Sequence, residues 1–419
     1  MNRRAGLVAL LAAEVISALG NWISVIVLPW LVLVRTGSPV LMGLVAVGVL
    51  VPYLASGVLA APLADRFGLR RTSIATDLGS ALATAAIAAV PEIGYLPLLV
   101  LAGMSGALRG VGDRAKHVLL APMARQAGMP VIRMTSLYET LTRGTQMVGA
   151  PVGGLLIYWL GTNPAIWVDA ATFVVCAALV AVWVRPVEPA TGPTHAPAAR
   201  EPYLTALRGG VSALWRDRVL FAMIVAIFVV NVVTQAGTTV FVPLWVAEVL
   251  RSPAALGIVL SAFAAGAVLG GVVFTVLAPK MPPYLMFGVA VMVSGGPRLL
   301  VLGGDNVALV LAVTFGSGVA VAAVNPILGA LLYERVPPRL QTRVFGLVAA
   351  GTYGGLPAGA ALAGIAVAAF GFHTATLLGG VLAIAVSALT LRMLQQAVRT
   401  DRNRPYDDIP AVVRQRDRS

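Results

Sequence analysis

The chain contains little charge and almost no cysteine. Only 11% of its 419 residues are charged, whereas a soluble globular domain carries about 25%. Hydrophobic residues make up 58%, so the composition predicts a membrane protein that crosses the bilayer several times and excludes a soluble enzyme. Cys176, the one cysteine, lies in an apolar run, so no disulfide can form within the chain.

The sequence also lacks the short motifs of several chemistries. It has no G-x-x-x-x-G-K-[ST] phosphate-binding loop, no metal-ligand cluster and no hydrolytic motif. We therefore expect no cofactor, no metal and no enzymatic activity, and uphill transport would draw on an ion gradient. The first apolar run has no A-x-A-like site at its end and is too long for a cleavable signal peptide, so it is predicted to be a spanning helix.

Long apolar runs predict the architecture. A spanning helix needs roughly 20 apolar residues, and twelve such runs predict an all-α polytopic membrane protein. The first six are Gly6–Val34, Val40–Ala61, Thr72–Val90, Tyr95–Leu120, Met134–Leu160 and Ala165–Val184. The second six are Leu220–Leu250, Ala254–Ala278, Tyr284–Leu302, Val307–Tyr333, Val344–Phe370 and Thr374–Leu394.

The two sets of helices indicate a duplicated chain. Pro29 and Pro243 have the same separation as Gly43 and Gly257, which is typical of two six-helix halves related by a parallel repeat. Between them, 186–202 is rich in Pro, Ala and Thr and predicts a flexible linker, and 203–218 predicts a short amphipathic helix. The predicted domains are an N-terminal half (1–184), a cytoplasmic linker (185–218), a C-terminal half (219–394) and a cytoplasmic tail (395–419).

Basic residues fix the predicted orientation. The formal net charge is +13, and the loops predicted to face outward hold few basic residues beyond Arg35 and Arg251. The positive-inside rule then places both termini in the cytoplasm. The basic residues are scattered over loop ends without interleaved aromatic residues, which argues against a nucleic-acid partner.

The charged stretch Pro62–Arg71 separates the second and third predicted spans, and is predicted to form a turn in water because charges at the bilayer centre cost about 2.5–3.5 kcal/mol each. It resembles the loop between helices 2 and 3 of the major facilitator superfamily, G-x-L-x-D-R-x-G-R-[KR]-x, with Ala61 and Leu69 as departures. A generic basic turn is the alternative. The resemblance implies a conformational-switch loop formed by Asp65, Arg66, Gly68, Arg70 and Arg71.

A second motif lies in the fifth predicted span. Gly149-Ala150-Pro151-Val152-Gly153-Gly154 resembles the G-P-x-x-G-G motif of drug/proton antiporters. Pro151 and Gly154 keep the spacing, Gly149 stands one place early, and Leu155 replaces the last glycine. Small residues also serve ordinary helix packing, which is the alternative explanation.

Ionisable residues within spans are costly and mark functional sites. Arg109 and Asp113 form an i,i+4 pair of opposite sign, as do Glu139 and Arg143, so that a carboxylate can switch between protonated and ion-paired states. Glu14 has no partner nearby in sequence. The predicted proton-coupling residues are Glu14, Arg109, Asp113, Glu139 and Arg143.

Other ionisable residues are predicted to have simpler roles. Asp77 and Asp169 lie near the ends of their predicted spans, where headgroup contacts or capping would explain them. Lys116 is predicted to be interfacial, together with Arg114 and His117. In the second half, Arg298 is the ionisable residue predicted to lie at depth.

In the superfamily, helices 1, 4, 7 and 10 line the central cavity. By that resemblance the substrate-binding residues are Asn21, Trp22, Trp30, Asn231, Gln235 and Asn325. Their mixture of aromatic and amide groups suits a large amphipathic compound. Helix–helix hydrogen bonding is the alternative role for the amides.

Several segments narrow the resemblance. Gly20–Ser24, Leu28–Val32 and Leu137–Thr140 look like the branch that holds macrolide exporters and Tap-type multidrug efflux pumps. This implies a monomeric secondary exporter of antibiotic-like molecules in the bacterial plasma membrane, driven by proton antiport, whose partners are substrate, protons and lipid. The alternatives are a siderophore or metabolite exporter or permease, and a non-transporting sensor with a transporter fold.

Overall fold

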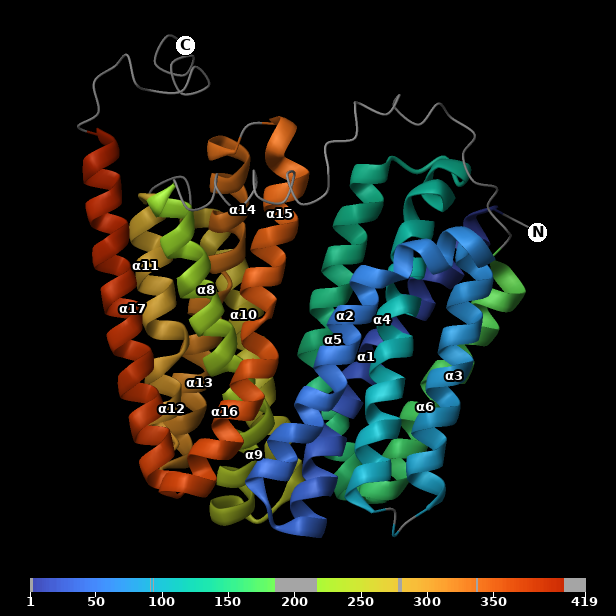
Figure 1. Cartoon of the computed structure of the whole chain (residues 1–419), viewed down its shortest axis with the longest axis horizontal. Coiled ribbons are helices and arrows are strands. Elements are labelled where there is room, and N and C mark those ends of the chain that lie inside the picture. The colour runs from blue at the N-terminus through green and yellow to red at the C-terminus, as the bar shows by residue number, and fades with distance from the viewer. Residues whose placement is uncertain are drawn as a thin grey trace. The chain divides into compact units, whose positions relative to one another are not determined.

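The computed structural model describes residues 3–90, 92, 94–184, 217–277, 281–336 and 338–402. Figure 1 shows their helices. The first half contains α1 (Arg3–Thr36), α2 (Pro39–Phe67), α3 (Leu69–Ala89), α4 (Tyr95–Gln126), α5 (Val131–Leu160) and α6 (Thr162–Trp183). The second half begins with α8 (Arg218–Ala236), the π-helical η1 (Gly237–Phe241), α9 (Val242–Trp245), π-helical η2 (Val246–Leu250) and α10 (Pro253–Leu277). It continues with α11 (Pro283–Ser294), α12 (Gly296–Val301), α13 (Val307–Val321), α14 (Val324–Arg335), α15 (Pro338–Tyr353), α16 (Gly355–Phe370) and α17 (Phe372–Arg402).

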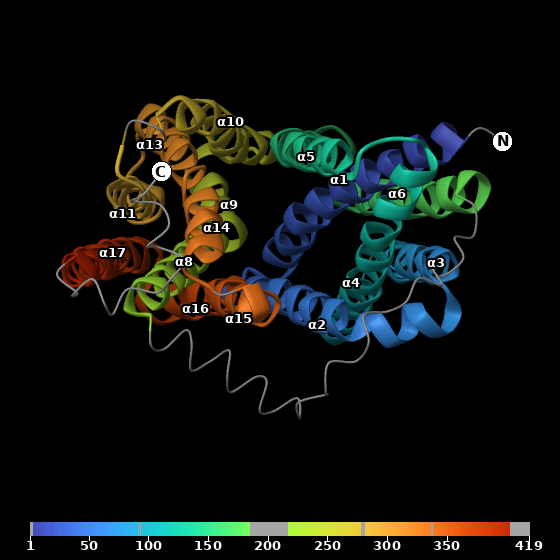
Figure 2. The same ribbon diagram turned by 90° about the horizontal axis from the view of Figure 1, so that it is seen from above.

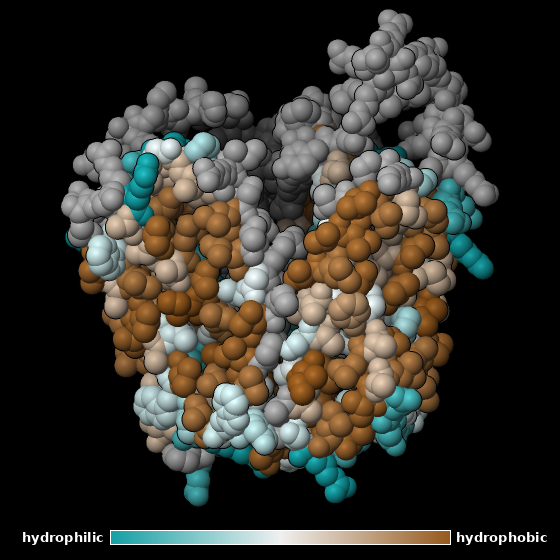
Figure 3. All heavy atoms as spheres, turned by 180° about the vertical axis from the view of Figure 1, so that it is seen from behind, coloured by the Kyte–Doolittle hydropathy of each residue, from teal (hydrophilic) through white to brown (hydrophobic). Residues whose placement is uncertain are grey.

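The predicted all-helical membrane architecture is confirmed. Eleven helical stretches of the described residues are long and apolar enough to cross a membrane. The predicted fifth span corresponds to the 30-residue α5, several of whose side chains lie outside the described residues. Hydrophobic residues cover the flanks of the face seen in Figure 3, and hydrophilic residues gather toward its two ends, as lipid contact requires.

The chain divides into two compact units. The first contains Met1–Gly192 with Thr238–Ser261 and Ala360–Phe372, and the second contains Pro193–Gly237, Ala262–Gly359 and His373–Ser419. One buried core of the first unit includes Leu10, Leu119 and Cys176, whereas the core of the second includes Met223 and Phe287. The domain boundaries and the amphipathic linker helix stay predictions, because 185–216 lies outside the described residues.

The predicted turn over Pro62–Arg71 is wrong in its extent. α2 continues to Phe67 and α3 begins at Leu69, so that Gly68 alone interrupts the helices. Its φ of 81° is positive, and glycine adopts a positive φ without the steric penalty that a side chain would add. The side chains of Asp65 and Arg66 lie outside the described residues.

Close helix packing in the first unit prepares the site. α4 packs against α2 and α3, and α1 packs against α5 and α6, an arrangement visible end-on in Figure 2. Gly106 and Gly110 bring α4 so close to α2 that a Cβ atom would collide with the carbonyl oxygens of Val49 and Tyr53. These glycines therefore set the neighbouring polar residues of α4 against α2.

Candidate functional site

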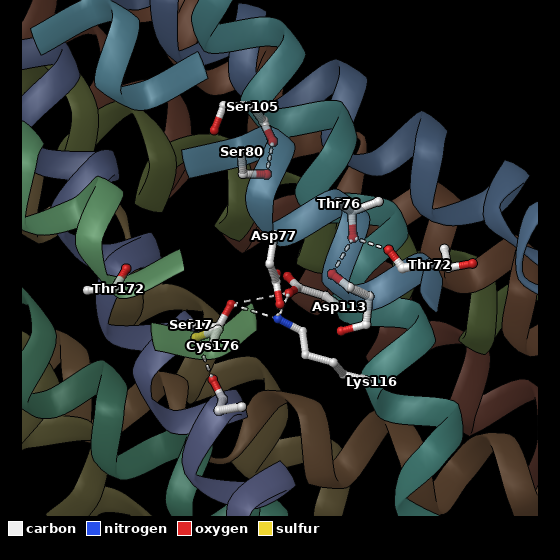
Figure 4. A network of polar contacts seen from close by, with 12 residues as sticks. Ser17, Thr72, Thr76, Asp77, Ser80, Ser105, Asp113, Lys116, Thr172 and Cys176 are labelled. Atoms are coloured by element: carbon white, nitrogen blue, oxygen red, sulfur yellow. Dashed lines mark hydrogen bonds and ion pairs between the residues drawn. The ribbon is translucent and has the colours of Figure 1, made fainter. Parts of the chain in front are cut away.

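Lys116 is the centre of a buried ionic network in the first unit (Figure 4). Its ammonium Nζ lies 3.1 Å from Asp77 Oδ1 and 3.4 Å from Asp113 Oδ1. It also donates a hydrogen bond of 3.2 Å to Ser17 Oγ, which donates one of 3.4 Å to Asp113. The side chains of Lys116 and Asp77 are 0% and 1% exposed, so helices α1, α3 and α4 share a buried polar site.

Further polar groups extend this network. Tyr53 on α2 donates a 3.3 Å hydrogen bond to Asp113 Oδ2. Glu14 on α1 interacts electrostatically with Lys116. Its Oε1 atom is buried without a hydrogen-bond partner among the described residues. Two carboxylates thus contact one ammonium group, and a third carboxyl group interacts with it electrostatically.

The interfacial assignments of Lys116 and Asp77 are wrong. α4 continues past its predicted end at Leu120 to Gln126, and α3 begins at Leu69 rather than Thr72. Asp77 therefore lies about 12 Å along its helix at 1.5 Å per residue, deep enough to meet Lys116. Each charge is tolerated because the other neutralises it.

Asp169 is also buried rather than located at a helix end. Its side chain on α6 is 2% exposed and accepts a hydrogen bond from Ser24 Oγ on α1. The other carboxylate oxygen, Oδ1, has no hydrogen-bond partner within the described ranges. Gly20, one turn earlier on α1, has no room for a side chain because a Cβ atom would lie 2.9 Å from this second oxygen.

The predicted pair between Arg109 and Asp113 does not form, because Asp113 pairs with Lys116 one turn further along α4. Arg109 is 4% exposed, and its Cζ lies 5.8 Å from the ring centroids of both Tyr53 and Phe173. Aromatic faces attract a cation at such distances. Among the described residues, Arg109 makes no ion pair.

The remaining predicted coupling and motif residues lie around this region or outside the described side chains. Glu139, Arg143 and Pro151 occupy α5, but their side chains are outside the described residues. Gly149 and Gly154 are buried in the same helix, and a Cβ atom on Gly149 would lie 2.6 Å from Trp22 Cβ. Among the loop residues, Arg70 is half-buried and donates a hydrogen bond to the Ala181 carbonyl, while Arg71 is exposed.

The predicted substrate residues occupy α1, α8 and α14. On α1, Trp30 is buried at 7% exposure, and Asn21 and Trp22 are half-buried. Asn231 donates a 2.9 Å hydrogen bond from Nδ2 to the Thr352 carbonyl, which is the alternative role considered for the amides. Gln235 is half-buried and Asn325 is exposed.

Sequence reasoning missed Ser17, Tyr53 and Lys116 as members of the site. The apolar residues that follow Lys116 in α4 were a usable signal, because they place the lysine well before the helix end. Ser17 and Tyr53 carry no such signal, since hydroxyl residues are common in spans and their partners come from distant helices.

The comparisons with known proteins agree with this architecture. A family model described as Major Facilitator Superfamily matches residues 10–300 and 229–416. The chain belongs to the Major Facilitator Superfamily. It is therefore a transporter and a multi-pass protein of the bacterial plasma membrane.

Its relatives include efflux proteins. The chain is 28% identical to the multidrug efflux pump Tap of Mycobacterium tuberculosis over 94% of this chain and 96% of that protein. It is 28% identical to Tap of Mycolicibacterium fortuitum, over 89% and 91% of the two chains. It is 24% identical to YfiS, an MFS-type transporter of Bacillus subtilis, over 92% of each chain.

Solved transporter structures share the fold. The D323A mutant of the nucleoside transporter NupG matches with a TM-score of 0.77 at 13% identity, over 93% of this chain and 99% of that one. A bacterial homologue of the human lysosomal transporter Spinster matches with a TM-score of 0.71 at 14% identity, over 94% and 98%. The resemblance to the superfamily stated from the loop and helix motifs is confirmed.

Proposed function

We propose that this transporter is a secondary exporter of antibiotic-like amphipathic small molecules, driven by proton antiport. The similarity to Tap over 94% of the chain supports the drug substrates. The buried network around Lys116 supports a proton-coupled mechanism, and it is the observation that carries this part of the proposal. Both termini then lie in the cytoplasm, and the protein acts as a monomer.

Proton exchange would proceed through the network's own geometry. When Asp77 and Asp113 are both ionised, both can hold the Lys116 ammonium. A proton that enters at Asp113, which is 27% exposed, would break the i,i+3 ion pair within α4 and leave the ammonium on Asp77. Because Asp77 lies on α3, the charge of Lys116 would then strengthen the contact between α3 and α4, and deprotonation of Asp113 would relax that contact again.

Glu14 and Glu139 provide additional proton carriers in this proposal. Glu14, on α1, interacts electrostatically with the same ammonium group, so that it can take part in the exchange. Glu139 and Arg143 on α5 stay proposed coupling residues on the grounds of their sequence spacing. Asp65, in the last turn of α2, stays the proposed conformational switch.

Efflux from proteoliposomes tests the proposal. The full chain is reconstituted with ethidium inside, and efflux is measured with and without an imposed pH gradient. The parent should export ethidium faster with the gradient. Asp77→Asn and Glu14→Gln mimic the protonated acids but cannot cycle, so they should keep downhill exchange and lose the response to the gradient. Asp305→Asn, on an exposed loop residue, is the matched control and should behave as the parent does.

Three outcomes would contradict parts of this mechanism. If the parent moves neither ethidium nor any compound of an antibiotic panel, the drug-exporter assignment is wrong. If the parent exports ethidium without any response to the pH gradient, proton antiport is wrong. If both variants respond to the gradient as the parent does, coupling lies elsewhere, and Glu139→Gln becomes the next variant.

A further inference from the structure

Arg298 is a buried cation of the second unit, and two of its three guanidinium nitrogens have no hydrogen-bond partner among the described residues. It lies on α12 and is 2% exposed. In the part of the chain that the structure describes, these two atoms, Nε and Nη2, are buried and unbonded. Arginine remains protonated in proteins, and a buried charged donor that is left unbonded costs more than a neutral one. The position therefore calls for an acceptor.

Its neighbours hold the guanidinium group without neutralising it. Cζ lies 4.9 Å from the ring centroid of Phe263 on α10, where the aromatic face attracts the cation. Gly237, the first residue of η1, also borders the group. A Cβ atom at this glycine would lie 3.4 Å from Cζ and 3.5 Å from Nη1, which are ordinary contact distances. Gly237 therefore leaves room for about one methyl group beside the guanidinium group.

The described carboxylates of this unit do not serve Arg298. Only Asp217 and Asp305 have carboxylate side chains that the structure describes here. Asp217 is paired with Arg335 at 3.1 Å, and the 19-residue α8 separates it from Gly237 by about 28 Å along the helix axis. Asp305 is exposed in the loop after α12. Neither forms an ion pair with Arg298.

The backbone around Arg298 is irregular in two spans. α11 gives way to α12 at Gly295, and α8 gives way to the π-helical η1 at Gly237. π-helical turns occur frequently at functional sites, and interrupted helices form binding sites in many transporters. A second buried polar atom without a partner, Thr314 Oγ1, lies on α13, which packs against α12.

We propose that Arg298 is an anion-binding residue, whose guanidinium N–H groups donate hydrogen bonds to a carboxylate of the transported compound or to a halide ion from solution. Both sources offer an acceptor for the Nε and Nη2 groups, which have no partner among the described residues. For a carboxylate substrate the inference rests on the proposed export function and adds an anionic group to its substrate class. Anion binding itself can be measured without transport.

A matched pair of dyes separates the possibilities. Rhodamine B carries a free carboxylate, and its ethyl ester lacks one. Binding of each to the purified full chain is measured by fluorescence anisotropy, at low and at high chloride concentration. Arg298→Gln should weaken rhodamine B binding at least about tenfold, the loss expected when a charge-assisted hydrogen bond is removed, while ester binding should change little. Arg298→Lys keeps the positive charge but lacks the planar guanidinium group, so it should lose less affinity for rhodamine B than Arg298→Gln does.

Gly237→Ala keeps the test independent of the folding of the arginine variants. Its methyl group fits at contact distance but occupies the space beside the guanidinium group, so it should weaken rhodamine B binding without lowering the unfolding temperature. Gly316→Ala is the control, because nothing lies within 4 Å of a Cβ atom there. Chloride that raises the unfolding temperature of the parent, but not of Arg298→Gln, would identify a halide ion as the ligand.

The proposal is overturned if neither rhodamine B nor chloride distinguishes the parent from both Arg298→Gln and Gly237→Ala. Equal losses for rhodamine B and its ester would also overturn it, because they would indicate a general packing role. Failure of the parent to export either dye from proteoliposomes would count against the proposed export function instead. The binding measurements would still decide the role of Arg298.

Discussion

The two units treat buried charge in opposite ways. In the first, Lys116 has two carboxylate partners within 3.4 Å and a hydroxyl group to complete its bonding. In the second, Arg298 is equally buried but rests against Phe263 with no described carboxylate beside it. The first arrangement is internally compensated and suits proton exchange, whereas the second is incomplete and suits a ligand. The two halves, predicted from the sequence to be repeats of one six-helix unit, therefore bury different charged groups.

Removal of the Lys116 ammonium group should have the largest effect on stability and on coupling among the changes considered for the two units. Lys116→Met keeps an unbranched side chain of similar length but leaves Asp77 and Asp113 buried without their counter-ion. Breaking a buried ion pair costs about 3–5 kcal/mol, so the unfolding temperature in detergent should fall sharply and gradient-driven efflux should disappear. Arg114→Met, at an exposed position on the same helix, is the control and should change stability little.

A compensating pair of substitutions sharpens this prediction. Lys116→Met combined with Asp77→Asn and Asp113→Asn removes all three charges and should recover much of the lost stability. It should not recover the response to a pH gradient. If Lys116→Met alone unfolds at the parent temperature and still couples efflux to the gradient, the network has neither role.

The next largest loss of stability should come from disturbing the packing of α1 against α5. Gly149→Ala would place a Cβ atom 2.6 Å from Trp22 Cβ and 2.8 Å from Cγ, so α1 and α5 would have to separate. Overpacking of this kind costs about 1–3 kcal/mol. Gly144→Ala on the same helix meets nothing within 4 Å and should be neutral or slightly stabilising. Equal unfolding temperatures for the two variants would contradict the packing role of Gly149.

The second unit has one described ion pair, and its loss should lower the free energy of unfolding by less than the two changes above. Asp217 accepts hydrogen bonds from the backbone N–H groups of Val219 and Leu220 at the start of α8, and also pairs with Arg335. Asp217→Ala removes both roles and should destabilise by about 1–2 kcal/mol, most of it from the cap. Asp217→Asn keeps the cap, so it should lose less stability than Asp217→Ala. The ratio of the two effects, measured by thermal unfolding, separates capping from ion pairing.

Sequence reasoning reached the fold but only part of the site. Apolar runs located the spans because the bilayer requires that length of hydrophobic helix whatever the tertiary structure. The same logic failed at Asp77 and Lys116, since their positions depend on where the helices end and on partners from other helices. The Arg109–Asp113 pair was wrong because spacing along one helix does not reveal a competing cation such as Lys116.

The smallest expected effects concern two amides of the second unit that the sequence could not tell apart. Asn231 donates a 2.9 Å hydrogen bond to the Thr352 carbonyl, so Asn231→Ala should cost about 1 kcal/mol of stability. Asn325 is exposed on α14, and Asn325→Ala should leave the unfolding temperature unchanged.

Transport selectivity should show the reverse order. An amide already engaged with the backbone has less capacity to orient a ligand than an exposed one, so Asn325→Ala should alter the ranking of exported compounds more than Asn231→Ala does. The measurement is drug susceptibility of a pump-deficient bacterium that expresses each variant, normalised to protein level. If Asn231→Ala changes the ranking while Asn325→Ala does not, the ligand reaches α8 by displacing the Thr352 contact, and Asn231 is the residue that selects substrates.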